Sequence, residues 1–214
     1  MKNDLRGASW PLWRRLFLEG AVILVSILLA LGADAWWQER IDRAEEQVIL
    51  VALRDELSGN EVPLRAQADS IFESVALLRR ILELPEDEFL QAVAADLDSR
   101  IAGAVQRPWT VEFRVGALDG TMGSGKASLI RSHALTAELA QYQAVRRELD
   151  EIGGLLGEVA VDSFVSFGGL PQTYSQLRAL LNAKAGYWTA YLRYLDRFIT
   201  HTTGLVQLLE AELQ

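Results

Sequence analysis

The sequence lacks several residue types that common functional sites need. Its 214 residues include no cysteine, which excludes disulfides, thiolate metal sites and cysteine nucleophiles. Only two histidines are present, His133 and His201, too few for a histidine-rich metal centre. Five prolines among abundant Leu, Ala, Glu and Arg favour long helices. Metal, redox and thiol chemistry therefore have little support.

Positive charge and catalytic motifs are scarce as well. The formal net charge of −8 argues against nucleic-acid binding, which needs a cationic surface. The sequence contains no H-E-x-x-H, no G-x-S-x-G and no G-x-G-x-x-G after a strand. We therefore expect a protein that is not an enzyme and that holds no cofactor and no metal.

One stretch comes close to a phosphate-binding loop. "GTMGSGKAS" matches G-x-x-x-x-G-K-[ST] at Gly120, Gly125 and Lys126, but an alanine replaces the hydroxyl residue that should bind magnesium. A phosphate loop also needs a preceding strand, and no second strand pattern exists for it to join. The sequence favours a hinge loop made by Gly120, Gly123 and Gly125 between a short helix and a long one. A degenerate nucleotide-binding loop is the minor alternative.

The N-terminal region contains a long apolar run. From Leu16 to Ala35 only Glu19 and Asp34 are charged, and twenty helical residues span the roughly 30 Å of a bilayer core. Tryptophans flank both ends of the run, where amphipathic rings prefer the lipid headgroups: Trp10, Trp13, Trp36 and Trp37. A buried core helix would explain the run but not the flanking tryptophans. We predict a transmembrane helix over residues 16–35.

The charges around this run predict its orientation. Four basic residues precede it, including Arg14 and Arg15, whereas Asp34 to Glu56 holds seven acidic residues and three arginines. Because positive residues stay cytoplasmic, we expect residues 1–15 in the cytoplasm and residues 36–214 outside. In a bacterium with two membranes, this places the protein in the inner membrane with a periplasmic domain.

A cleaved export signal is the alternative to an anchor. "RRLFL" from Arg14 resembles a twin-arginine signal, and Ala33-Asp34-Ala35 fits an A-x-A cleavage site. However, Glu19 stands where a basic residue is usual, and cleavage would leave Trp36 and Trp37 at a new terminus. We expect the segment to be retained as an anchor.

Polar residues inside the predicted span suggest a partner in the membrane. Glu19 either pairs with Arg15 at the interface or contacts another membrane helix. Ser26, Ala30 and Asp34 form a small polar stripe that suits helix packing. The expected partners are the lipid bilayer and an integral membrane protein, with a homo-oligomer as another arrangement.

The remaining chain predicts an all-α fold, an antiparallel helical bundle that continues from the membrane helix. We expect a first helix after Trp37, with Ile41, Val48 and Val51 (or Ala52) on its apolar face, and a break or kink at Ser58–Pro63. Further helices are expected over 64–84, 86–104, a short stretch capped by Thr110, 132–167, and 172–214.

The apolar faces of the later helices follow a three-four spacing. Ile71, Val75, Leu78 and Leu82 share one face. The long helix carries Leu135, Leu139, Tyr142, Leu149, Ile152, Leu156 and Val159. The last carries Trp188, Tyr191, Leu195, Phe198, Thr202, Leu205, Leu209 and Leu213. At this spacing, we interpret the aromatic residues as bundle core rather than a ligand site.

Two segments resemble a family of uncharacterised bacterial single-pass inner-membrane proteins. "LEGAVILVSILLALGADAWWQERIDRAEEQ" is similar to its anchor pattern "GEI-x-LV…GILIALQ-x-N-x-W", with Glu19 and Gly20 in the reverse order. "GSGKASLIRSHALTAELAQYQ" resembles its "SSG-x-L-x-L-I…L…L…Y" segment. The two segments cover about a third of the chain. The resemblance implies a membrane anchor and a helical extracytoplasmic domain, without an assigned activity.

These observations predict a non-enzymatic interaction protein, an accessory or scaffold subunit of an inner-membrane complex. The alternative is a periplasmic ligand-sensing bundle that signals through a partner's membrane helix, because only about fifteen residues precede the span.

Overall fold

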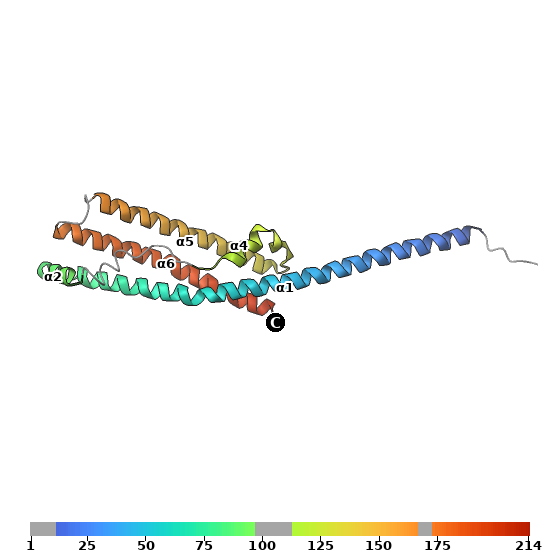
Figure 1. Cartoon of the computed structure of the whole chain (residues 1–214), viewed down its shortest axis with the longest axis horizontal. Coiled ribbons are helices and arrows are strands. Elements are labelled where there is room, and N and C mark those ends of the chain that lie inside the picture. Colours follow the sequence, from blue (N-terminus) through green and yellow to red (C-terminus); the bar gives the residue numbers. More distant parts are fainter. Residues whose placement is uncertain (1–11, 97–112, 167–172) are drawn as a thin grey trace, which may run out of the picture. The chain divides into compact units, whose positions relative to one another are not determined.

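The computed structural model describes residues 12–96, 113–166 and 173–214, and these residues confirm the all-α prediction (Figure 1). No strand occurs in these three ranges. In chain order the elements are α1 (Leu12–Leu82), α2 (Glu86–Asp96), α4 (Gly116–Gly123), the 3-10 helix η1 (Lys126–Leu129), α5 (His133–Ser166) and α6 (Tyr174–Glu212).

The chain divides into two compact units, of which the first ends at Gln47 and the second begins at Val48. The described part of the first unit is the start of α1, and its large apolar side chains are exposed. The second unit contains the rest of α1 and all the other helices, and it buries the hydrophobic core. The bundle is therefore a property of residues 48–214.

Within the bundle, α1 presents one narrow seam to the core. Its buried side chains recur every three or four residues, the spacing that keeps one helical stripe against its partners. They are Ile49, Leu50, Leu53, Leu57, Asn60, Leu64, Ile71, Ser74, Val75, Leu78 and Ile81. The predicted face was wrong at this end of the bundle, because Val48 and Val51 are exposed, as is Ile41 in the first unit.

Helix α6 runs antiparallel to α1. Arg65 donates a hydrogen bond to Thr203 at 3.1 Å, and Arg79 donates one to Thr189, also at 3.1 Å. As the residue number rises along α1, that of its partner falls along α6. Both helices contribute to one hydrophobic core, in which Trp188 is fully buried.

Helix α5 completes the bundle and packs against α6. Its predicted face is confirmed where side chains are described: Leu135, Leu139, Tyr142, Leu149 and Leu156 are buried and Ile152 is half-buried. The predicted face of α6 is buried as well, from Trp188 to Leu209. The rings of Tyr142 and Phe198 lie 4.9 Å apart across the two helices. The side chain of Val159 lies outside the described set.

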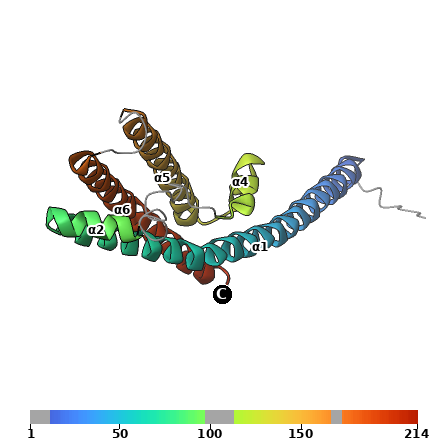
Figure 2. The ribbon, with the colours of Figure 1, turned by 60° about the vertical axis from the view of Figure 1, so that its left-hand side comes forward.

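Helix α2 closes the end of the bundle where α1 stops (Figure 2). Phe89 and Val93 of α2 form a second apolar cluster with Leu78 and Ile81 of α1 and with residues near the start of α6. Pro85 precedes α2 and Glu86 opens it, as expected of a helix start. The predicted continuation of this helix beyond Asp96 lies outside the described residues, as does Thr110. The short helix expected after Thr110 was predicted too early, because residues 113–115 are not helical and α4 begins at Gly116.

The expected break at Ser58–Pro63 is absent. Helix α1 continues through this stretch with Pro63 inside it, so the two helices predicted on either side are one. A proline there removes a backbone hydrogen bond and crowds the carbonyl four residues earlier. The helix persists because tertiary contacts oppose this local preference.

Candidate functional site

The first candidate site is the exposed apolar part of α1. Close to the N-terminus, α1 contains a window long and apolar enough to cross a membrane, and none of that window is buried. Trp13 stands before the predicted span, and Trp36 and Trp37 follow it, all largely exposed. The lack of burial separates this segment from a core helix, which would satisfy the same length and composition. Trp10 lies outside the described residues, as do the side chains of Arg14 and Arg15.

The polar positions within this segment are exposed too. Glu19, Ala30 and Asp34 lie on the surface of α1. Ser26 is also exposed, and its hydroxyl donates a hydrogen bond to the carbonyl of Val22 at 2.8 Å. A serine within a helix commonly satisfies its hydroxyl in this way when no water is near. These side chains are therefore open to contact from outside the chain.

A group of charged side chains follows the apolar segment on α1, next to Trp36. The guanidinium of Arg40 lies 5.8 Å from the ring centroid of Trp36, within the range of a cation–π contact. Glu39 and Arg43 form an ion pair one helical turn apart. Together these four residues line a shallow open depression on the helix.

The glycine-rich stretch covers the second half of α4, a short turn and η1, so of the three glycines predicted to form a hinge loop only Gly125 lies in a loop. Gly120 lies inside α4, Gly123 is its last residue, and Gly125 has a φ of 75°, in the left-handed region that favours glycine. Lys126 then begins η1. A helix precedes the lysine where a phosphate loop requires a strand, so the geometry gives the nucleotide-binding alternative no support.

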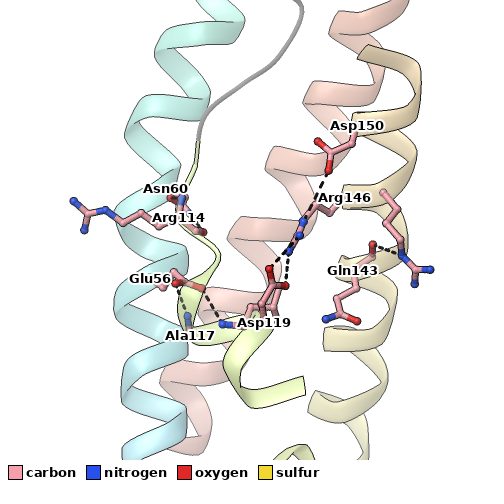
Figure 3. A network of polar contacts seen from close by, with 10 residues as sticks. Glu56, Asn60, Arg114, Ala117, Asp119, Gln143, Arg146 and Asp150 are labelled. Carbon is pink, nitrogen blue, oxygen red and sulfur yellow. Dashed lines mark hydrogen bonds and ion pairs between the residues drawn. The ribbon is translucent and has the colours of Figure 1, made fainter. Parts of the chain in front are cut away.

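A pair of side chains on α1 holds the backbone just before this turn (Figure 3). The carboxylate of Glu56 accepts hydrogen bonds from the backbone N–H groups of Ala117 at 2.7 Å and Leu118 at 3.0 Å. These are N–H groups of the first turn of α4, which have no partner within their own helix. Glu56 thus caps α4 from a neighbouring helix, and its negative charge interacts favourably with the positive N-terminal end of the α4 dipole.

Asn60, one turn further along α1, completes this contact. Its amide nitrogen donates to the carbonyl of Arg114 at 2.7 Å, and its amide oxygen accepts from the Arg114 N–H at 2.8 Å. Asn60 is 1% exposed, so both bonds are shielded from water. We call Glu56, Asn60 and the backbone of residues 114–118 the α1 clamp.

An ion pair ties α4 to α5 on the other side of the clamp. Arg146 donates to both carboxylate oxygens of Asp119, at 2.8 and 3.3 Å, and its Nε lies 4.0 Å from Asp150 (Figure 3). The hydrogen bond to Asp119 raises the pKa of Arg146 above its ordinary value. Helix α4 is therefore fixed at its start to α1 and in its middle to α5.

Three ionisable side chains lie deep in the core, Lys184, Tyr142 and Tyr191, and burial raises the pKa of Tyr191. Lys184 of α6 is 5% exposed, its ammonium lies 5.1 Å from the ring centroid of Trp188, and burial lowers its pKa to about 8. Burial raises the pKa of Tyr142 to about 12, and Thr202 beside its hydroxyl opposes part of this rise. The hydroxyl makes no hydrogen bond of ordinary geometry among the described residues. In the described ranges no group of acidic, His or Cys side chains has the arrangement of a metal site.

No protein-family model, curated protein or solved structure matches this chain in the comparisons. The resemblance to single-pass inner-membrane proteins therefore remains a prediction that rests on the two quoted segments. The α1 clamp and Lys184 were missed at the level of sequence. The signal that was available is their spacing, since both Asn60 and Lys184 interrupt an apolar stripe at a position where the stripe continues on either side.

Proposed function

We propose that this protein is a membrane-anchored, non-enzymatic interaction protein, an accessory or scaffold subunit of an inner-membrane complex. The observation that carries the proposal is the apolar start of α1, which is exposed along its whole length in a chain whose bundle is otherwise well packed. Exposed apolar surface of this extent is the mark of contact with lipid or with another protein.

The charge distribution supports the orientation. The basic residues before Leu16 and the acidic excess after Ala35 favour a cytoplasmic N-terminus and a periplasmic bundle. The proposed partner is an integral membrane protein that contacts Glu19 and the stripe of Ser26, Ala30 and Asp34. A carboxylate in this setting is costly unless another polar group meets it.

Membrane anchoring is tested by alkaline carbonate extraction of the full chain with Leu28→Arg. Leu28 lies near the middle of the apolar segment, where an arginine costs about 3 kcal/mol on insertion scales. Leu155→Arg is a matched control, because both leucines are similarly exposed, at 58% and 55%, but Leu155 belongs to α5. We expect the wild type and the control in the membrane pellet and a large soluble fraction for Leu28→Arg. Equal behaviour of the two variants would contradict the anchor.

The partner is tested by photo-crosslinking in native membranes, with a photoreactive residue at Ser26 or, as a control on a different face of the same helix, at Leu24. We expect Ser26 to give a discrete adduct with another membrane protein and Leu24 to give mostly lipid adducts. An adduct only with a second copy of the chain would support a homo-oligomer in place of a subunit. Lipid adducts alone at both positions would remove the scaffold proposal.

A further inference from the structure

The charged side chains that follow the apolar segment share one face of α1 with Trp36. Trp36, Glu39, Arg40 and Arg43 are three or four residues apart, a spacing that brings side chains together on a helix. They line an open depression of about 290 Å³, which we call the Trp36–Arg43 depression. This volume is close to the lower limit of roughly 300 Å³ for small-molecule sites, so the depression suits one small polar group.

Both arginines of the depression turn back towards the apolar segment. The guanidinium of Arg40 lies over the ring of Trp36, and that of Arg43 pairs with Glu39, in each case a residue four positions earlier. Side chains on a helix lean towards its N-terminus, and these contacts hold both arginines in that direction. The positive charge of the depression is therefore concentrated on the side nearer the apolar segment.

The depression lies at the depth of the lipid phosphates when residues 16–35 span a membrane. The headgroup layer extends about 5–7 Å beyond the hydrocarbon core. At roughly 1.5 Å per residue, the backbone of Arg40 lies about 7 Å beyond Ala35 along the helix, and that of Arg43 about 12 Å. Because both side chains turn back, their guanidiniums reach the headgroup layer, where tryptophan rings are also favoured.

The charges of the depression suit a phosphate group. Two guanidiniums and one carboxylate give a net positive charge, and a guanidinium binds phosphate through two parallel hydrogen bonds. A guanidinium has five N–H donors, so the bond from Arg43 to Glu39 leaves donors for a phosphate. The same ion pair is largely exposed, so its rearrangement around a bound phosphate costs little.

We propose that the Trp36–Arg43 depression binds the phosphate of a phospholipid headgroup. The phosphate lies between the guanidiniums of Arg40 and Arg43, which Trp36 and Glu39 hold towards the headgroup layer. Such binding fixes α1 at one depth in the bilayer, which an apolar segment alone does not do. This inference rests on the membrane anchor proposed above and adds to it a site with a defined ligand chemistry.

Native mass spectrometry of the full chain in detergent tests the site, with phosphatidylglycerol as the probe. Diacylglycerol with the same acyl chains lacks the phosphate, and glycerol phosphate lacks the acyl chains. We expect the wild type to retain phosphatidylglycerol, to retain much less diacylglycerol and to bind no glycerol phosphate. Equal retention of the two lipids would overturn phosphate recognition, and displacement of phosphatidylglycerol by equimolar glycerol phosphate would identify a free phosphate as the ligand in place of a lipid.

The double variant Arg40→Gln with Arg43→Gln tests the residues. A basic side chain near a membrane surface changes binding of an anionic lipid by about five-fold, so the two together should lower retention of phosphatidylglycerol by about 30-fold. Arg54→Gln with Arg80→Gln is the matched control, because it makes the same change of net charge on the same helix. The proposal is refuted if the Arg40 and Arg43 variant binds like the wild type, or if the control loses as much binding.

Alkaline carbonate extraction of the same variants separates failure of this site from failure of the anchor. Neither double variant alters the apolar segment, so both should stay in the membrane pellet with the wild type. A wild type that stays in the pellet but retains phosphatidylglycerol no better than diacylglycerol would remove the phosphate site and leave the anchor. A wild type released by carbonate would remove both.

Discussion

Replacement of the buried Lys184 by methionine should stabilise the protein. Lys184 is almost fully buried, and its pKa is lowered from 10.5 to about 8 because burial penalises the ammonium. A depression of this size corresponds to about 3 kcal/mol of unfavourable energy for the charged form at neutral pH. Methionine keeps the unbranched stem and removes the charge, at the loss of a cation–π contact with Trp188 worth about 1 kcal/mol and of the ammonium's other interactions. We expect a net gain of up to about 2 kcal/mol.

The lowered pKa of Lys184 also predicts how the free energy of unfolding depends on pH. Between about pH 8 and 10 the folded state has released the Lys184 proton while the unfolded state still holds it, so the unfolding free energy rises with pH. Above pH 10 the trend reverses, because burial raises the pKa of Tyr142 and Tyr191 and only the unfolded tyrosines ionise. The Lys184→Met variant should lack the rise between pH 8 and 10 but keep the fall above it.

Thermal unfolding of the full chain in detergent, followed by circular dichroism at pH 7 and pH 9.5, measures both effects. At roughly 2–4 °C per kcal/mol for a chain of this size, Lys184→Met should raise Tm by up to about 8 °C at pH 7. Lys126→Met is the control, since Lys126 is exposed and should change neither Tm nor its pH dependence by much. A wild-type Tm that does not rise from pH 7 to pH 9.5, or a variant less stable than the wild type, would refute the reasoning.

Four further outcomes follow from the contacts described. Tyr142→Phe should change stability by no more than about 1 kcal/mol in urea titrations, because the buried hydroxyl makes no hydrogen bond of ordinary geometry and has only Thr202 beside it. Glu56→Ala should cost about 2–3 kcal/mol in the same titration, since it removes two bonds from a charged group to the first turn of α4. Leu53→Ala should cost about 2–5 kcal/mol, as Leu53 is fully buried, and a smaller loss would mean that the core collapses around the cavity. Lys126→Ala should leave folding, membrane location and nucleotide titrations unchanged, and nucleotide-dependent stabilisation of the wild type alone would revive the phosphate-loop hypothesis.

The helices α5 and α6 could be predicted from the sequence because their apolar residues keep one spacing over many turns. The last helix shows this from Trp188 to Leu209, where each expected core position is buried. Long amphipathic patterns of this kind leave only one face that can meet the core. The all-α class follows from the same regularity together with the low proline content.

Helix α1 was harder to predict for two physical reasons. Val48, Ile49, Leu50 and Val51 form an unbroken apolar run, so periodicity does not tell which of them face inward, and only the middle two are buried. At Pro63, local propensity indicates a break, whereas the tertiary contacts that override it come from residues more than fifty positions away along the chain.

The spacing of Asn60 and Lys184 within apolar stripes indicates buried positions, but no sequence pattern identifies the groups that the polar side chains meet. A glutamate or an asparagine on a helix is normally assigned to solvent, and nothing local shows that Glu56 and Asn60 meet the backbone of a distant segment. Lys184 was missed for the same reason, because a lysine in an apolar stripe is expected to extend its charge to water. In each case the fold determines which group the side chain contacts, and the residues next to it in the sequence do not.

The order of the helices also affects how the chain can be made. The seam of α1 shares its core with α6, the last helix to leave the ribosome, and the contact of Arg65 with Thr203 joins residues 138 positions apart. At typical synthesis rates of about 5–20 residues per second, the α1 seam waits on the order of 10 s for its partner. During that time the nascent chain exposes the seam of α1 as well as the apolar start of the same helix. The seam of α1 therefore needs prolonged protection during synthesis, until α6 has been made.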